Sequence, residues 1–424
     1  MPRDMKNSGI SWIGEIPVKW SVHPLKYDFQ FIAGATPDSA NANMWDGDVL
    51  WITPADYKTK DIYVSGGSRN LSDLGYKSCS THMLPTGTIV VSKRAPIGSV
   101  AVTTKELCTN QGCLGLVRKC EDTSEKYYYY ALSIYDDVLN LYGSGTTFKE
   151  ISATVFSNIK MVAPPSFQQK SIVAFLDSKC AEIDALSSDI QSEIEILEAY
   201  KRSVITEAVT KGLDKNVPMK ESGIEWAEKV PAHWKVMQNK YIMKKIKNIC
   251  PVYNGEDILS LTMNGVIVRD LDAGGKMPAS FNGYQSIYPG NLLMCLFDYD
   301  VTPRCIGLIK NEGLTSPAYS QFVMKNENTA EYYYYYYLMI DFTKELLHLA
   351  KNLRHSFTED QLGTINAPVP PIDEQMAIAK YLDNKCAEIE TIIAQKQEQL
   401  AVLADYKKSV IYEYVTGKKE VPVA

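Results

Sequence analysis

The chain has 424 residues, more than one hydrophobic core usually holds, so two or three domains are expected. Hydrophobic residues make up 45% and charged residues 22%, as in ordinary globular proteins. No apolar run approaches the ~18 residues that a membrane span requires, and the polar first ten residues do not resemble a secretory signal. Nine scattered cysteines without a CxxC pair favour the reducing cytoplasm, and a net charge of −6 excludes a protein that is basic overall.

The acidic excess is unevenly distributed. It lies mostly in residues 161–217 and 369–424, whereas the larger segments 1–160 and 218–368 are close to neutral. A protein that holds DNA by itself usually carries a basic face. Any nucleic-acid role therefore requires local basic patches, or partners that supply part of the affinity.

The first block has the pattern of a mixed α/β domain. Strands are predicted at residues 49–52, 88–91, 100–102 and 114–117. The tyrosine run 127–130 stands where a helix is predicted to begin. Its position favours a helix face packed on a sheet over a platform for base stacking.

A long helix is predicted over residues 170–211, because apolar residues recur at steps of three and four. Its proposed pairing positions are Leu176, Ile183, Ile190 and Leu197. Ser166 and Gln169 fit a capping box before it, and Gly212 fits a stop. About 40 residues would give a rod of roughly 60 Å. Such an apolar stripe requires a partner helix.

The second half repeats the frame of the first. Ser-Gly-Ile-x-Trp at residues 8–12 recurs at 222–226, and Pro-x-x-Trp at 17–20 recurs at 231–234. Pro-Pro at 164–165 recurs at 370–371, residues 176–183 recur at 382–389, and residues 200–205 recur at 406–411. The middles differ, although strands are predicted at 258–261 and 291–294 and a second tyrosine run lies at 332–337.

The second long helix ends near Gly417, and its pairing positions are Leu382, Ile389, Leu400 and Leu403. The expected fold class is α+β: two mixed α/β domains separated by two long antiparallel helices that form a coiled coil. Because the halves are tandem copies, antiparallel pairing would relate them by a pseudo-twofold axis. The repeated Cys180 and Cys386 are interpreted as small residues facing a helix partner.

Polar residues on turns are the candidates for base contact. In the first block they are Lys93, Arg94, Asn110, Gln111, Thr146, Thr147 and Lys149. In the second block they are Arg304, Ser316, Tyr319, Arg354, His355 and Ser356. For any single position, a solvated loop residue is the competing interpretation. Phe148 and Phe357 recur in matching loops and are interpreted as buried anchors.

Motifs for catalysis are missing from the sequence. There is no Walker A motif, no Asn-Pro-Pro-aromatic or Asp-Pro-Pro-aromatic methylation motif, no G-x-G-x-x-G loop and no HExxH, and the five histidines are isolated. We therefore expect a non-catalytic chain without cofactor or metal.

The duplicated frame of Ser-Gly-Ile-x-Trp, Pro-x-x-Trp, Pro-Pro and a helix ending in Tyr-Lys-Arg/Lys-Ser-Val-Ile resembles the specificity subunit of type I restriction–modification systems. The resemblance implies target-recognition domains at 1–165 and 214–371, a central helical spacer at 166–213, and a distal spacer and tail at 372–424. Each domain would recognise one half of a bipartite site in double-stranded DNA. The helices would set the spacing and dock two methyltransferase subunits, which recruit restriction (translocase–nuclease) subunits, in a complex that methylates adenine and cleaves DNA.

Three alternatives remain open from the sequence. In the first alternative, the chain is a coiled-coil scaffold with two protein-binding domains and no DNA role. In the second, it is an enzyme such as a nuclease with an unrecognised active site. A third alternative keeps the DNA role but pairs the chain with a fused methyltransferase–nuclease polypeptide.

Overall fold

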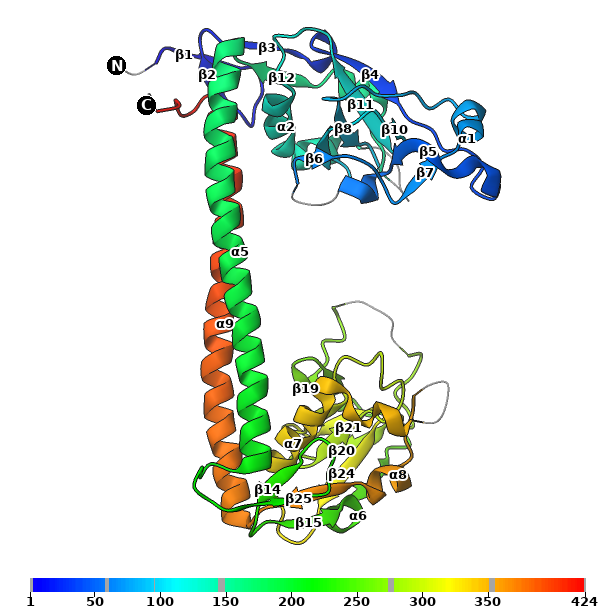
Figure 1. Ribbon diagram of the computed structural model, residues 1–424, viewed down its shortest axis with the longest axis vertical. Helices are drawn as coiled ribbons and strands as arrows, with labels where there is room; N and C mark the ends of the chain where they lie inside the picture. Colours follow the sequence, from blue (N-terminus) through cyan, green and yellow to red (C-terminus); the bar gives the residue numbers. More distant parts are fainter. Residues whose placement is uncertain are drawn as a thin grey trace. The chain divides into compact units, whose positions relative to one another are not determined.

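The computed structural model describes residues 3–57, 61–94, 96–143, 149–273, 278–350 and 355–422 (Figure 1). These residues form two compact units. The first comprises Met1–Asp189 with Glu398–Ala424, and the second comprises Ile190–Gln397. Each unit thus contains one globular domain together with parts of both long helices.

The globular domain of the first unit is built on a five-stranded sheet. Its strands, in spatial order, are β4 (Phe29–Ala33), β11 (Cys113–Arg118), β8 (Ile89–Ser92), β9 (Val100–Thr103) and β6 (Tyr63–Val64). β8 is buried along its whole length, because Ile89 and Val91 belong to the core that includes α2 (Glu125–Ser133), while Val90 packs in a second core on Leu84 and Ala101. Coverage on both faces explains why three consecutive residues of this central strand, Ile89 to Val91, are apolar.

Smaller elements complete this unit. The paired strands are β1 (Met5–Asn7) with β2 (Glu15–Pro17), β3 (Ser21–Pro24) with β12 (Lys160–Ala163), and the set β10 (Cys108–Thr109), β5 (Trp45–Ile52) and β7 (Arg69–Leu71). The short helices are α1 (Asp73–Ser78), α3 (Asp136–Tyr142) and α4 (Ala153–Ser157).

The second unit has a four-stranded antiparallel sheet in the order β16 (Met243–Ile246), β24 (Ser320–Met324), β21 (Leu292–Met294) and β22 (Ile306–Leu308). The tyrosine-rich helix α7 (Ala330–Thr343) shares its core. The other strands are β17 (Asn248–Ile249), β20 (Gln285–Ile287) and β23 (Gly313–Thr315), the hairpin β18 (Leu259–Thr262) with β19 (Gly265–Val268), and the pairs β13 (Met219–Glu221) with β14 (Lys229–Pro231) and β15 (Lys235–Gln238) with β25 (Asn366–Val369). The short helices are α6 (Asn239–Ile242) and α8 (Glu359–Thr364).

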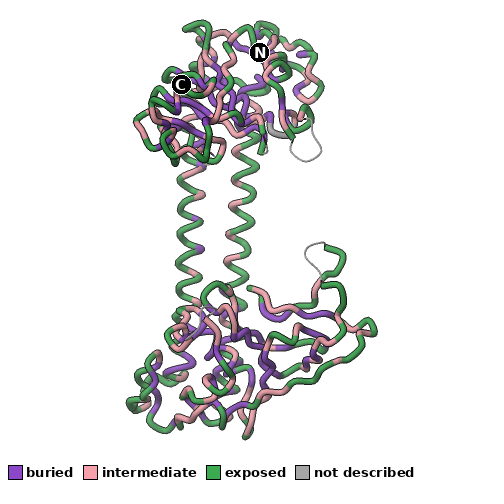
Figure 2. Tube along the Cα trace, turned by 90° about the vertical axis from the view of Figure 1, so that its right-hand side faces the viewer, coloured by how far each residue is buried: buried purple, intermediate pink, exposed green. Residues whose placement is uncertain are grey.

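The two long helices are α5 (Ser166–Lys211) and α9 (Ile372–Val415), and they lie side by side in each unit (Figures 1 and 2). In the first unit Asp184 pairs with Lys407 at 2.6 Å, and in the second Glu193 pairs with Lys396 and Lys201 with Glu390. In the first unit, the partner on α9 moves from Tyr414 to Lys407 as the chain of α5 advances from Phe175 to Asp184. In the second unit it moves from Lys396 to Glu390 as α5 advances from Glu193 to Lys201, so the pairing is antiparallel in both units. The predicted fold class is confirmed.

The apolar stripes form the seam between α5 and α9. Among the predicted pairing residues, five are buried: Leu176, Ile183, Ile190, Leu382 and Ile389. The other three are half-buried: Leu197, Leu400 and Leu403. Buried or half-buried residues recur every three or four positions along both helices, because an α-helix returns to the same face with that period.

Candidate nucleic-acid interface

In the first unit, three loops meet where the chain leaves β8. The backbone N–H of Lys93 donates to Gly112 O at 2.8 Å, and Lys93 O accepts from the N–H of Ile151 at 2.9 Å. The predicted sites at Lys93, Arg94, Asn110, Gln111 and Lys149 are thereby brought to one end of the sheet. Thr146 and Thr147, predicted in the same group, and Phe148, predicted as an anchor, lie outside the described residues.

Glu150 neutralises part of the positive charge at this sheet end. Its carboxylate accepts from Lys93 Nζ at 2.8 Å and from Arg94 Nε at 2.9 Å. The hydrogen bond from Lys93 is the main reason why the pKa of Glu150 lies below its ordinary value. The Lys93 side chain is only 15% exposed, whereas that of Arg94 is 44% exposed, so Arg94 is better placed to reach an incoming ligand.

The neighbouring loop is held by its own amide groups. Asn110 Oδ1 accepts from the N–H of Gly112 at 2.9 Å, which uses the side chain to close the turn. Gln111 is exposed and accepts a hydrogen bond from the Thr36 hydroxyl. Gly34 is required at this point, because a Cβ there would overlap the backbone oxygens of residues 109 and 110. The side chains of Gln111 and Lys149 are thus exposed to solvent, whereas the Asn110 side chain stabilises the turn.

In the second unit, the predicted sites divide into two groups. Ser316 and Tyr319 lie on the turn before β24, where Gln285 Nε2 donates to both of their backbone oxygens, at 2.9 and 2.7 Å. The Tyr319 ring stacks on Phe297 with 6.0 Å between centroids. This contact joins the turn to the loop 296–304, which connects β21 to β22.

His355 and Ser356 lie against the same loop. His355 Nδ1 lies 2.9 Å from Asp300 Oδ2, and the N–H of Phe357 donates to Leu296 O at 2.8 Å. Phe357 is buried and meets Tyr299 edge to face, which confirms its predicted role as an anchor. Ser356 is half-buried, and Arg354 lies outside the described residues. The loop 296–304 is thus the common support of the candidate residues in this unit.

Arg304 occupies a different environment from the one expected of a base-contacting residue. Its guanidinium donates from Nη1 to the Tyr334 hydroxyl at 3.3 Å, and the side chain is half-buried beside α7. The sequence placed it on a turn, but no local signal indicated that a tyrosine thirty residues later would engage it.

The two tyrosine helices attach each domain to the long helices. In the first unit, the Tyr127 hydroxyl donates to Val162 O and Val415 O at 3.0 and 2.9 Å, and the Tyr130 hydroxyl donates to Asp177 at 2.8 Å. Burial, followed by the bond to Asp177, raises the pKa of Tyr130, so its hydroxyl remains a donor. The tyrosine run therefore packs inside the domain, as predicted.

The same attachment recurs in the second unit. The Tyr332 hydroxyl donates to Val209 O at 2.9 Å, and the Tyr335 hydroxyl donates to Asp383 at 2.7 Å. Asp177 and Asp383 are equivalent residues of the sequence repeat. The conserved part of the repeat thus encodes one junction, built twice.

The repeated tryptophans bond to side chains in the first turns of the long helices. Trp20 donates from its indole to Gln168 at 2.5 Å, and Trp234 donates to Glu374 at 2.8 Å. Gln169 does not form the predicted capping box with Ser166. Its side chain instead accepts from the N–H of Ser124 at 3.0 Å and donates to Pro164 O at 2.9 Å, which ties α5 to α2. Because these partners are distant in sequence, spacing alone could not indicate them.

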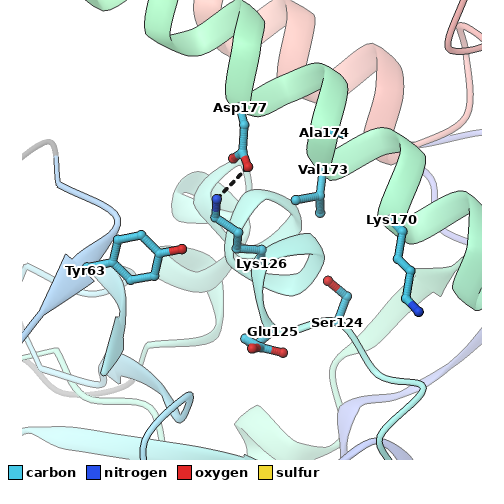
Figure 3. A pocket seen from close by; sticks show the side chains of 8 residues that line it. All are labelled: Tyr63, Ser124, Glu125, Lys126, Lys170, Val173, Ala174 and Asp177. Carbon is cyan, nitrogen blue, oxygen red and sulfur yellow. Dashed lines mark hydrogen bonds and ion pairs between the residues drawn. The ribbon is translucent and has the colours of Figure 1, made fainter. Parts of the chain in front are cut away.

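A polar hollow of about 300 Å³ lies at the first junction, between α2 and α5 (Figure 3). The ammonium of Lys126 projects toward it and pairs with Asp177 at 2.5 Å. Asp177, which neutralises this cation, also accepts the hydrogen bond from Tyr130. The hollow is therefore interpreted as part of the junction between α2 and α5. Within the described residues, no cluster of three or more His, Cys, Asp or Glu side chains is arranged to hold a metal ion. None of the described helices combines the length and apolar character of a membrane span.

Comparison with known proteins identifies a family. The model of the type I restriction modification DNA specificity domain matches residues 17–196 and 306–401. The MjaIX specificity subunit of a type I restriction enzyme from Methanocaldococcus jannaschii is 34% identical over 188 residues, which cover 44% of this chain and 43% of that protein. The MjaVIII specificity subunit of the same organism is 25% identical over 324 residues, which cover 72% of each protein.

A solved structure has the same fold over almost the whole chain. It is described as showing complex assembly and conformational transition of the type I R-M system. The match has a TM-score of 0.70 at 13% identity and covers 95% of this chain and 99% of the other.

Proposed function

The chain belongs to the type I restriction–modification DNA specificity family, and from this membership we propose that it selects a two-part DNA target without catalysing a reaction itself. The domains at 1–165 and 214–371 would each recognise one half-site, and the helical segments at 166–213 and 372–424 would set the spacing between them. One observation carries this proposal: the junction is repeated contact by contact, whereas the loops that it presents differ between the two units.

The first half-site would be contacted at the end of β8. Arg94, Gln111 and Lys149 are exposed there, and these side chains offer the hydrogen-bond donors that recognise bases or phosphates. In the second unit the corresponding role falls to the surface formed by loop 296–304, the turn at 316–319 and residues 355–356. Different donors on equivalent supports would select different half-sites.

Docking of two methyltransferase subunits is supported by apolar side chains left exposed on the long helices. In the first unit these are Leu186, Val402 and Tyr406, with exposed fractions of 49%, 62% and 52%. Their repeat equivalents in the second unit are Ile392, Ile196 and Tyr200, with 42%, 68% and 48%. Exposed apolar groups of this kind mark protein contacts. Because the set occurs once per unit, it suits two copies of one partner.

Such partners would also compensate for the chain's lack of net positive charge. Glu150 neutralises part of the Lys93 and Arg94 charge, and the net charge is −6. Since phosphate neutralisation supplies most non-specific DNA affinity, methyltransferase subunits that contact phosphates would supply what this chain lacks. Restriction subunits would join through them to form a complex that methylates adenine and cleaves DNA. Family membership favours this role over a coiled-coil scaffold without a DNA target.

Methylome sequencing tests the proposal. Cells that carry this gene and its neighbouring methyltransferase gene are compared with cells in which this gene alone is deleted. We expect one split motif to be methylated only when the gene is intact. Methylation that is identical in both strains, with the methyltransferase shown to be expressed, would instead support the scaffold alternative.

A further inference from the structure

Two cysteines face each other at the ends of neighbouring strands in the second unit. β21 and β22 are antiparallel, with Met294 opposite Ile306, so the next opposed pair is Cys295 and Cys305. The N–H of Cys295 donates to Cys305 O at 2.9 Å. The N–H of Cys305 donates instead to Asp341 Oδ2 at 2.9 Å, so only one of the two backbone bonds of a paired position joins these residues. Opposed residues of antiparallel strands have Cα atoms roughly 4.5–5.5 Å apart, which lies within the ~4.4–6.8 Å that a disulfide spans. The backbone is therefore already arranged for a bond between these sulfurs.

The surroundings of this pair differ from those of the other buried cysteines. Lys344 Nζ donates to Cys305 Sγ at 3.4 Å and is held by Asp341 at 2.6 Å. A hydrogen bond from Cys305 lowers the pKa of Cys295, so negative charge on its sulfur is stabilised. By contrast, burial raises the pKa of Cys113 to about 12 and that of Cys386 to about 11. Because a thiolate is the reactive form of cysteine, Cys295 is the more nucleophilic of these thiols.

We propose that Cys295 and Cys305 are a reversible redox-modification site, which hydrogen peroxide or a small-molecule disulfide converts to an intrachain disulfide. With peroxide, the Cys295 thiolate attacks one oxygen, the O–O bond breaks, and a sulfenic acid forms as hydroxide leaves. The Cys305 sulfur then attacks the Cys295 sulfur, the S–S bond forms, and the sulfenic oxygen leaves as water with the Cys305 proton. The two sulfurs lose two electrons, and peroxide is reduced to two water molecules.

Oxidation would remove hydrogen bonds that hold the loop 296–304. When both cysteines are protonated, the Cys295 thiol can donate to Phe297 O at 3.2 Å, and the Cys305 thiol has Thr302 O at 3.7 Å and Tyr299 O at 3.9 Å as acceptors. A disulfide has no S–H donor, so these carbonyls lose their partners. Since this loop supports the candidate base-contacting residues of the second unit, oxidation would weaken recognition of the second half-site. This consequence rests on the proposed function.

Thiol mapping on the full chain tests the modification site. The protein is treated with increasing hydrogen peroxide, unfolded in an alkylating reagent, digested and analysed by mass spectrometry. We expect a Cys295–Cys305 crosslinked product, lighter than the reduced peptides by two hydrogens and reversed by dithiothreitol. It should be lost in Cys295→Ser and retained in the matched control Cys113→Ser. Recovery of both cysteines as free thiols, at a dose that oxidises the exposed Cys120, would overturn the proposal.

A methylation assay tests the consequence for recognition. The complex of this chain with its methyltransferase subunits is assayed on its target DNA before and after oxidation. We expect loss of methylation on oxidation, recovery with dithiothreitol, and resistance in Cys305→Ser. A crosslinked complex that methylates at the undiminished rate would refute the effect on the loop. A reduced complex that shows no target preference would count against the proposed function, while the thiol map would still decide the redox site.

Discussion

The C-terminal end of α9 provides a sharp test of how the junction is built. Gly417 has φ +71°, and a Cβ at this position would lie 2.5 Å from Pro17 Cδ and 2.9 Å from Trp20 Cζ3. These are atoms of rigid rings, which cannot move aside as the end of a flexible side chain does. The Gly417→Ala substitution therefore combines a left-handed backbone penalty of about 1–2 kcal/mol with an overpacking penalty of about 1–3 kcal/mol.

Two other glycines of the chain serve as matched controls. Gly212 ends α5 at φ +75°, but its Cβ would lie 3.2 Å from Trp234, so little beyond the backbone penalty is expected. Gly9 has φ +71° and no atom within 4 Å of such a Cβ, so Gly9→Ala isolates the backbone penalty of about 1–2 kcal/mol. The predicted order of destabilisation is Gly417→Ala first, then Gly212→Ala, then Gly9→Ala.

Hydrogen exchange is the appropriate assay, because a chain of two units need not unfold in one step. In each variant, the opening free energy of the element beside the substitution is compared with that of the wild type: the last turns of α9 for Gly417→Ala, the last turns of α5 for Gly212→Ala, and the β1–β2 pair for Gly9→Ala. Gly417→Ala should lower it by about 2–5 kcal/mol, the sum of the two penalties. Equal losses in all three variants would refute the argument from ring contact, because they would show that backbone conformation alone sets the cost.

Three further predictions concern the proposed interfaces. Glu150→Gln should free the charge of Lys93 and Arg94, and so raise non-specific DNA affinity and its salt dependence, measured by binding titrations at several salt concentrations. Arg94→Ala should reduce methylation of the target by the assembled complex without destabilising the chain. Arg304→Ala should mainly lower the unfolding midpoint, because Arg304 bonds to Tyr334. If Arg94→Ala lowered the midpoint and Arg304→Ala reduced methylation, the two assigned roles would be exchanged. Val402→Asp should weaken binding of one methyltransferase copy and leave the other, so that sedimentation detects a complex with a single copy; loss of both copies, or of none, would contradict one site per unit.

The sequence was sufficient to predict the architecture because its signals are local and periodic. The long helices follow from apolar residues every three or four positions, and the seam residues Leu176 and Leu382 are buried as the pattern indicated. Gly212 ends α5 as expected of a residue that tolerates positive φ. Repetition added the second half of the architecture, because the same local signals occur twice.

The chemistry of the candidate sites was less predictable because it depends on distant partners. Lys93 and Arg94 were identifiable as a basic pair after a strand, but the carboxylate of Glu150 reaches them from 56 residues beyond Arg94. Arg304 satisfied the same local criterion and instead bonds to a tyrosine of α7. Local sequence specifies that a turn is polar, whereas tertiary packing decides which of its side chains remain available to a ligand.

The repeated junction also makes the modular interpretation testable within this single chain. Replacement of residues 27–160 by residues 241–366 keeps the long helices intact and removes the tyrosines that bond to Asp177 and Val415. The inserted block carries its own equivalents, Tyr335 and Tyr332, which make these contacts in the second unit. The chimera should therefore retain both junctions and present the second set of loops twice. If each domain recognises one half-site, methylome sequencing of cells with the chimera should show a motif in which the second half-site occurs twice and the first is lost. A folded chimera that still directs methylation to the first half-site would refute the assignment of that half-site to residues 27–160.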